Sequence, residues 1–275
     1  MVASPMASNE KKLDHWMAAR PAASATIGDM SRHRLLVVTL AAVATLATPS
    51  IAAAHDVLPD LGMAQLKDFR VDKAPSGQTL LRYSAIVVNT GSGRFQLDGT
   101  RTSTSGSQME VAQRIADSSG TSRTQPTAAR MYFAGDGHTH WHVADLEQSV
   151  LERLDNGVKV GSGAKHGFCF FDNYPFRLAL LGAPASAFYT TCGRDPNVSS
   201  QSMGLSVGWG DIYSYQLVDQ WIDITGLGPG RYRLRTTADA QNWFVEANET
   251  NNLTWVDLQL KSKGAPRVIQ YGPSA

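Results

Sequence analysis

Three histidines occupy alternate positions in one short segment, Asp136-Gly-His-Thr-His-Trp-His142: they are His138, His140 and His142. Side chains alternate between the two faces of a β-strand, so we predict that the three imidazoles project from one face, about 6–7 Å apart per step. Trp141 would then point the other way, into a core. Neutral imidazoles that converge on one point bind copper or zinc, and the spacing does not distinguish between these metals.

The elements that must position this run are strands and turns. The segment Leu80–Asn89 is rich in β-formers and ends in a turn over 89–93. Three further β-rich segments, Gln220–Thr225, Arg231–Thr237 and Asn251–Leu260, are separated by Gly- and Pro-containing turns. This spacing predicts an all-β fold, a single antiparallel β-sandwich or barrel-like domain with long loops.

Residues 99–130 are rich in Ser and Thr, which indicates an exposed excursion on the surface. Within it, Met109, Val111 and Ile115 share one face of a predicted strand, and Gln113 is the polar exception on that face. The turn residues 118–120 then favour a hairpin that returns toward Thr124.

Composition excludes some classes of function. The chain has 275 residues, of which 43% are hydrophobic and 18% are charged, as in globular proteins. Its net charge is +1, and residues 55–275 taken alone are also close to neutral. A near-neutral protein lacks the basic field that gathers phosphate, so we expect no nucleic-acid partner.

The N-terminal part has the features of an export signal. Arg32 and Arg34 form a positive n-region, 35–47 an apolar h-region, and Ala52-Ala53-Ala54 a cleavage site. The apolar stretch is too short for a transmembrane anchor, which needs about 20 residues. We therefore predict an N-terminal extension and signal peptide over 1–54, with Met30 as a candidate true start. A secreted domain over 55–262 and a C-terminal tail over 263–275 follow.

The cysteine count fits export. Cys169 and Cys192 are the only two cysteines, and an even pair in an oxidising compartment is most simply a disulfide. Closing this loop would stabilise the fold by roughly 3 kcal/mol in the chain-entropy model. A thiolate metal ligand is the alternative.

Several segments together resemble one family, the lysyl oxidases in their short bacterial form. They are His138-Thr-His-Trp-His142, Gly163-Ala-Lys-His-Gly-Phe-Cys-Phe-Phe-Asp172, Gly210-Asp-Ile-Tyr213 and Gln220-Trp-Ile-Asp-Ile-Thr225. Their order agrees with that of the family, and the resemblance covers essentially all of 56–260. Any one segment would be weak evidence, whereas the combination is specific.

The resemblance implies a copper-dependent amine oxidase with a built-in quinone. The family's copper ligands carry over to His138, His140 and His142. Its lysine tyrosylquinone, a cross-link between a lysine and an oxidised tyrosine, carries over to Lys165 and Tyr213. Tyr215 is a rival that lies two residues beyond the matched position. The finished quinone carbonyl condenses with a substrate amine, and hydrolysis frees an aldehyde while oxygen is reduced to hydrogen peroxide.

The reaction needs a base near the ring to remove the α-proton of the substrate. Asp211 is two residues from Tyr213 and shares its face if the segment is a strand, so we predict that it is this base. Asp219 and His166 are rivals, and a purely structural carboxylate is the alternative reading of Asp211.

An oxygen-rich cluster near the C-terminal end suggests a hard cation. Glu246, Asn248, Asn251 and Asn252 are dense carboxylate and amide donors. The resemblance implies a calcium site at this segment together with the early Asp60. Asn248 stands where the family commonly has Asp, which would weaken binding. An Asn-rich turn without an ion is the alternative.

These observations predict a secreted copper- and quinone-dependent oxidase of primary amines, with peptidyl lysine as a candidate substrate and molecular oxygen as co-substrate. No membrane anchor is expected after signal cleavage. A secreted copper-binding β-sandwich without oxidase activity, serving in metal handling or adhesion, is the alternative. It would need neither Lys165 nor Tyr213. A zinc hydrolase is less favoured because no glutamate beside the histidine run can act as its general base.

Overall fold

Residues 53–134 and 139–275 are described by the computed structural model, and within these ranges the chain forms β-strands and loops without a helix. Every strand pairing among them is antiparallel, so the predicted all-β class is confirmed. The predicted signal peptide, apart from Ala53 and Ala54, lies outside the described residues.

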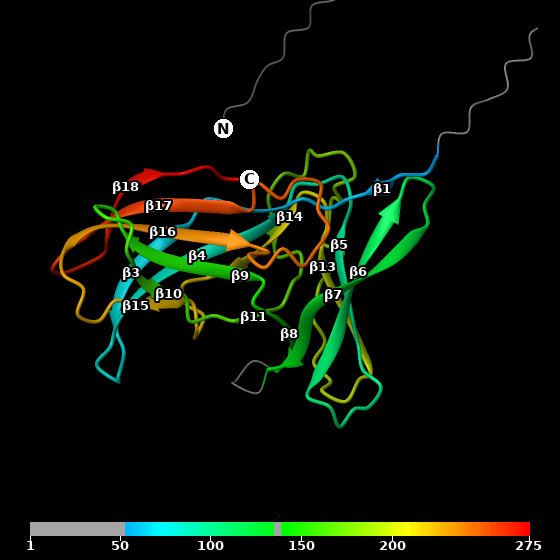
Figure 1. The fold of residues 1–275 in the computed structure, drawn as a ribbon, viewed down its shortest axis with the longest axis horizontal. Coiled ribbons are helices and arrows are strands. Elements are labelled where there is room, and N and C mark those ends of the chain that lie inside the picture. The colour runs from blue at the N-terminus through cyan, green and yellow to red at the C-terminus, as the bar shows by residue number, and fades with distance from the viewer. Residues whose placement is uncertain (1–52, 135–138) are drawn as a thin grey trace, which may run out of the picture. The chain divides into compact units, whose positions relative to one another are not determined.

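The strands form three sheets (Figure 1). A seven-stranded sheet contains β1 (Asp56–Val57), β5 (Phe95–Thr100), β6 (Gln108–Asp117), β7 (Ser122–Phe133), β8 (Trp141–Ala144), β11 (Gly167–Phe168) and β13 (Ser200–Leu205). A five-stranded sheet contains β9 (Glu147–Arg153), β10 (Lys159–Ser162), β16 (Gly230–Ala238), β17 (Leu253–Leu260) and β18 (Arg267–Tyr271). A six-stranded sheet contains β2 (Leu61–Met63), β3 (Lys67–Lys73), β4 (Thr79–Asn89), β12 (Tyr174–Pro175), β14 (Trp209–Tyr213) and β15 (Trp221–Asp223).

Strand β4 is the centre of the six-stranded sheet, and it matches the predicted strand Leu80–Asn89. Both of its faces are buried: Ala85 and Val87 join the main core, whereas Ile86 and Val88 belong to a smaller cluster. Burial on both faces explains why this segment is an almost continuous apolar run. Strand β14 pairs with β4, and its side chains likewise alternate between the main core, which contains Tyr213, and the smaller cluster, which contacts Ile212.

The five-stranded sheet covers the main core with alternating side chains. Leu234 on β16 lies opposite Leu151 on β9 and Val256 on β17. All three side chains are fully buried, and each such burial contributes about 1.5–3 kcal/mol. The predicted strands Arg231–Thr237 and Asn251–Leu260 are thus confirmed as β16 and β17.

The predicted hairpin is formed by β6 and β7. Met109 and Ile115 are fully buried, so the expectation of an exposed excursion is wrong for this face of β6. Gln113 is buried with them, and its amide group pairs with the backbone of Val245. Gln113 Nε2 donates to the Val245 carbonyl at 2.9 Å, and the Val245 amide donates to Gln113 Oε1 at 2.8 Å. These two bonds explain how a polar residue is tolerated in the core.

The segment predicted to be a C-terminal tail contains strand β18. It extends the five-stranded sheet, and Val256 of β17 lies opposite Tyr271. Near the chain end, the Ala275 amide donates to the Met63 carbonyl at 3.0 Å. The C-terminal residues are therefore hydrogen-bonded to two of the sheets.

Candidate functional site

The histidine run leads into strand β8. His142 lies in β8, whereas His140 precedes it, so the strand is shorter than predicted. The Nε2 atoms of His140 and His142 are 2.8 Å apart, and their ring centroids are 4.6 Å apart. His138 lies outside the described residues. Two imidazole nitrogens that meet at one point are suitable ligands for copper or zinc.

Trp141 anchors this segment from the opposite face, as the alternation predicts. Its side chain is fully buried, and its Nε1 donates to the Asp195 carbonyl at 3.0 Å. The guanidinium of Arg101 stacks on its ring, 4.9 Å from the centroid. This packing leaves His140 and His142 on the other side of the backbone.

Lys165 and Tyr213 meet beside the two histidines. Lys165 Nζ lies 5.1 Å from the centroid of the Tyr213 ring. The ring is buried and makes an edge contact with Phe168 at 5.1 Å between centroids. Tyr213 Oη donates to the Cys169 carbonyl at 3.0 Å. Burial first, and then the Asp211 carboxylate, raise the pKa of Tyr213 well above its usual value.

Asp211 lies on the same face of β14 as Tyr213, as its spacing predicts. Register places Asp211 opposite Val87 and Tyr213 opposite Ala85, and both side chains face the main core side of β4. Asp211 is only 1% exposed. Burial raises its pKa to about 7, against the lowering effects of the Tyr213 hydroxyl, Asn173 and Lys165.

Asn173 positions this carboxylate, and sequence reasoning missed it. Its Nδ2 donates to Asp211 Oδ1, and its Oδ1 accepts from the Ile212 amide at 2.8 Å. Asn173 directly follows the conspicuous Phe-Cys-Phe-Phe-Asp segment. That adjacency was the one available signal, but only the pairing of β12 with β14 brings it to Asp211.

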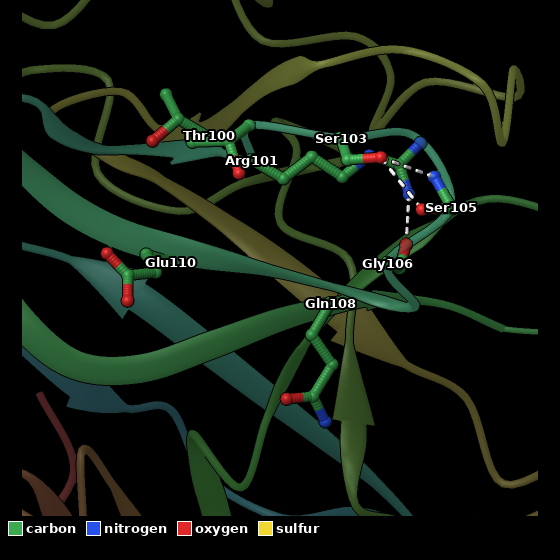
Figure 2. Close-up of a pocket in the computed structure, with 8 residues that line it drawn as sticks. Thr100, Arg101, Ser103, Ser105, Gly106, Gln108 and Glu110 are labelled. Carbon is green, nitrogen blue, oxygen red and sulfur yellow. Dashed lines mark hydrogen bonds between the residues drawn. The ribbon is translucent and has the colours of Figure 1, made fainter.

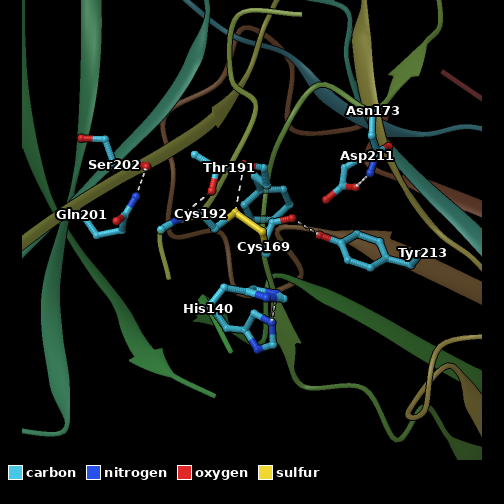
Figure 3. The surroundings of a disulfide bond; sticks show 12 residues. His140, Cys169, Asn173, Thr191, Cys192, Gln201, Ser202, Asp211 and Tyr213 are labelled. Atoms are coloured by element: carbon cyan, nitrogen blue, oxygen red, sulfur yellow. Dashed lines mark hydrogen bonds between the residues drawn. A yellow bond between two sulfur atoms is a disulfide. The ribbon is translucent and has the colours of Figure 1, made fainter. Parts of the chain in front are cut away.

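The disulfide joins two segments that hydrogen-bond to residues in or next to the site (Figure 3). The predicted pair Cys169–Cys192 is confirmed, with its Cα atoms 5.7 Å apart. The Cys169 carbonyl accepts from Tyr213, while Gly193, next to Cys192, accepts from the Trp141 amide at 3.3 Å. The disulfide therefore links Cys169, which accepts the hydrogen bond of Tyr213, to the segment that bonds to Trp141 between His140 and His142.

Gly167 allows strand β11 to approach the histidine strand closely. A Cβ at this position would clash with Tyr132 Oη and lie 2.6 Å from His142 Nδ1. Only a hydrogen atom fits there, so a residue with any side chain would displace Tyr132 or His142. Sequence reasoning had included Gly167 in a matched segment without assigning it a role.

The rival residues lie elsewhere. Tyr215 is outside the cavity and contacts Arg70, whose guanidinium is 5.5 Å from its ring centroid. His166 is exposed, and its Nδ1 lies 2.7 Å from Asp145 Oδ1. Asp219 is partly exposed and does not line the cavity either.

The residues converge on a cavity of about 250 Å³. Its lining combines His140, His142, Lys165, Tyr213 and Asp211 with Asn173 and the apolar Phe171, Ile212, Cys169 and Leu217. A larger cavity of about 540 Å³ lies beside the turn between β5 and β6 (Figure 2). Its Arg101 is already bonded to the Gly106, Pro196 and Val198 carbonyls. This larger cavity lacks a group of titratable side chains comparable to the one that lines the cavity with Lys165 and Tyr213.

Four of the five residues expected to bind calcium gather at a second site. Asn251 Nδ2 donates to the Asp60 carboxylate at 3.0 and 3.1 Å, and Asn252 Nδ2 donates to Glu246 Oε1 at 3.2 Å. Asn248 does not join them, because it is exposed and its Oδ1 accepts from Thr250.

The side-chain oxygens of Asn251 and Asn252 are buried, and neither has a hydrogen-bond partner within residues 53–134 and 139–275. Asp239 and Glu249, which sequence reasoning missed, approach Glu246 so that one oxygen of each lies within 4.8 Å of the others. Burial, then these neighbouring carboxylates, raise the pKa of Glu246 to about 9 against opposing hydrogen bonds. Unpartnered oxygens among clustered carboxylates fit a hard cation.

Similarity to known proteins indicates the family of this chain. The family model described as lysyl oxidase matches residues 105–269. The chain is 29% identical over 120 residues to lysyl oxidase homolog 3 of Homo sapiens, covering 42% of this chain and 14% of that protein. It is 32% identical over 122 residues to lysyl oxidase homolog 1 of Homo sapiens, covering 42% and 18%.

Lysyl oxidase homolog 4 of Mus musculus is 31% identical over 117 residues, covering 42% of this chain and 14% of that protein. The matched part therefore spans less than a fifth of the length of these relatives. The family model, in contrast, covers more than half of this chain and includes Lys165, Tyr213 and the histidine run. The chain belongs to the lysyl oxidase family.

Proposed function

We propose that this protein is a secreted, copper- and quinone-dependent oxidase of primary amines. Family membership supports an amine oxidase at the coarse level. The observation that carries the finer proposal is the 5.1 Å approach of Lys165 Nζ to the Tyr213 ring, in one cavity with His140 and His142. A protein that only bound copper would need neither the lysine nor the tyrosine.

The donor set fits the metal and the cofactor. His140 and His142, together with the predicted ligand His138, would hold copper, since imidazole nitrogens suit Cu(II). Lys165 and Tyr213 would form lysine tyrosylquinone, which supplies the electrophilic carbonyl for oxidation of the amine by oxygen. Tyr213 is buried and hydrogen-bonded to the Cys169 carbonyl, so its ring is oriented before any modification.

Asp211 is the proposed base for the α-proton of the substrate. It lines the cavity with Tyr213, and Asn173 holds its Oδ1 in place. With a pKa of about 7, the carboxylate can both accept and release a proton near neutral pH. Asp219 and His166 lack this position.

The cavity supports an unbranched primary amine as the substrate. Phe171, Ile212 and Leu217 supply an apolar wall, suited to the methylene chain of an alkylamine or a lysine side chain. A peptidyl lysine presents such a chain, and oxygen is the second substrate. Products would be the aldehyde, ammonia and hydrogen peroxide.

Secretion and calcium binding belong to the same proposal. The predicted signal peptide and the disulfide Cys169–Cys192 both fit an oxidising compartment. None of the described elements is a helix that could span a membrane. Calcium would bind at Asp60, Glu246, Asn251 and Asn252, where it would satisfy the two orphaned amide oxygens.

Peroxide release tests the function. Copper-loaded protein should release hydrogen peroxide on addition of simple primary amines, and phenylhydrazine should shift a visible chromophore and stop the release. Copper-bound protein that shows no peroxide, no chromophore and an unmodified Tyr213 would instead support the copper-binding protein without oxidase activity.

A further inference from the structure

Residues 214–220 form a loop that borders the candidate active site. Before the loop, β14 pairs with β4 up to Tyr213, which lies opposite Ala85. After it, β15 pairs with β4 again from Trp221, which lies opposite Arg82. Two residues of β4 separate these pairings, whereas seven residues join the paired strands. The longer segment therefore projects from the sheet, and we call it the 214–220 loop.

Leu217 lies in the middle of the 214–220 loop and lines the cavity with Lys165 and Tyr213. It is partly buried and packs against the main core. Leu217 is also one of the three apolar side chains of the wall that is proposed to contact the methylene chain of the substrate. The shape of this wall therefore depends on how the backbone of the loop is held.

The Arg82 side chain holds that backbone at two points. Its Nη1 donates to the Tyr215 carbonyl at 3.1 Å and to the Leu217 carbonyl at 2.9 Å. Its Nε pairs with Asp72 Oδ2 at 3.1 Å, which also orients the guanidinium. The Arg82 side chain is 19% exposed, so water competes little for these bonds. Hydrogen bonds from a charged guanidinium are stronger than those between neutral groups.

Other hydrogen bonds hold the same stretch of the loop. The Tyr215 amide donates at 3.0 Å to the hydroxyl of Ser84, a fully buried residue of β4. The Gln220 amide donates to the Leu217 carbonyl at 3.2 Å. The Leu217 carbonyl thus accepts from both Arg82 and Gln220. Strand β4 and the turn within the loop together fix the residue that lines the cavity.

We propose that Arg82 is a positioning residue that sets the preference of this protein for the chain length of its amine substrate, because it fixes Leu217 in the cavity wall. A fixed apolar wall removes water from each methylene of a bound alkylamine, whereas a loose wall leaves room for water. Arg82 acts through Leu217 and does not itself line the cavity. This inference rests on the proposed amine oxidase function.

The test compares unbranched amines from ethylamine to hexylamine. Peroxide release by copper-loaded, full-length protein gives kcat and KM for each amine. In wild type, each added methylene should raise kcat/KM by up to about fourfold, the gain expected for burying one CH₂ group. Arg82→Gln should reduce this gain to less than about twofold per methylene, mainly through KM, because interactions made equally in the ground and transition states change KM and not kcat.

Two further variants connect the effect to the loop. Leu217→Ala should reduce the gain per methylene in the same way as Arg82→Gln, because it removes the side chain that Arg82 positions. Arg82→Lys should retain part of the gain, since an ammonium group still donates to a carbonyl but lacks the fork of the guanidinium.

Arg233→Gln is the matched control. The Arg233 guanidinium also makes two hydrogen bonds, at 2.8 and 3.0 Å, but both go to Asp257 on β17 rather than to the 214–220 loop. This variant loses an arginine of comparable bonding and should keep the wild-type dependence on chain length.

A wild-type dependence on chain length in Arg82→Gln would overturn the inference, and so would a wild type that shows no such dependence. If Arg82→Gln fails to fold, Arg82→Lys decides: an unchanged dependence overturns the inference, and a weaker one supports it. Absence of peroxide from wild type with every amine would overturn the proposed function instead. Calorimetric titration of the copper-free proteins with the same amines then decides the role of Arg82: an equal gain in affinity per methylene in Arg82→Gln and wild type overturns it, and a smaller gain in Arg82→Gln supports it.

Discussion

Lys165 Nζ lies 5.1 Å from the centroid of the Tyr213 ring, although the two residues come from a loop before β11 and from β14. Tyr213 is held by its bond to the Cys169 carbonyl and by its edge contact with Phe168. Lys165 is flanked by backbone bonds at Gly163, Ala164 and His166. The pair is therefore prearranged by the fold, which is what covalent joining of an amine and a ring requires.

The first prediction concerns copper. Replacing His140 and His142 together with Ala should abolish stoichiometric copper binding, because their Nε2 atoms meet at one point. Metal analysis of the purified protein measures this. His166→Ala is the control, since His166 is exposed and lies outside the cavity. Unchanged copper content in the double variant would place the metal elsewhere.

The second prediction concerns the cross-link. Tyr213→Phe should remove both the visible chromophore and the peroxide, because the phenol oxygen is needed to make the quinone. Tyr215→Phe should keep both, since Tyr215 packs against Arg70 outside the cavity. Absorbance after copper loading and peptide mapping provide the measurements. The reverse pattern would assign the cofactor to Tyr215.

The third prediction concerns the base. Asp211→Asn should lower kcat by on the order of 10²- to 10⁴-fold, the usual contribution of a general base. Wild-type turnover should also fall as pH drops below about 7, because the pKa of Asp211 is about 7 and the protonated carboxyl cannot accept the α-proton. Steady-state kinetics against pH measures both effects. Asp219→Asn is the control, and a greater loss in that variant would transfer the role to Asp219.

The fourth prediction concerns calcium. Calcium at about 100 times its Kd should raise Tm by about 5–10 °C relative to chelator, because it binds only the folded state. Asn252→Ala should remove this response, since its orphaned oxygen is a proposed ligand. Asn248→Ala should keep the response, because Asn248 is exposed and bonded to Thr250. Coincident melting curves for wild type would leave only a structural turn.

The fifth prediction concerns the close approach of β11 to the histidine strand. Gly167→Ala should destabilise the fold by about 1–3 kcal/mol and weaken copper binding, because the new methyl group would collide with Tyr132 or His142. Denaturant unfolding and metal analysis test this. Gly228→Ala is the control, because a Cβ there meets nothing within 4 Å. Wild-type stability and copper content in Gly167→Ala would contradict the prediction, because Tyr132 and His142 would then accommodate the methyl group without measurable cost.

Much of the fold could be predicted because strand patterns are local. Alternating apolar and polar side chains and turn residues predict the strands β4, β16 and β17. The presence of only two cysteines predicts the disulfide Cys169–Cys192. Short strands such as β10 and β12 carry too few residues for a period to appear. The pattern also predicts a longer strand than β8, which begins at Trp141 and so leaves His140 outside it.

The sequence by itself determined the kinds of groups present: alternating histidines, a lysine and a tyrosine in matched segments, a cysteine pair and an oxygen-rich turn. The tertiary structure decided which of them meet. Register between β14 and β4 turns Asp211 and Tyr213 toward the main core. The pairing of β12 with β14 brings Asn173 to Asp211, and the Asn248 side chain accepts hydrogen bonds from Thr250. Contacts such as that between Asn173 and Asp211 join residues far apart along the chain, so their distances depend on the register and packing of whole sheets rather than on any local spacing.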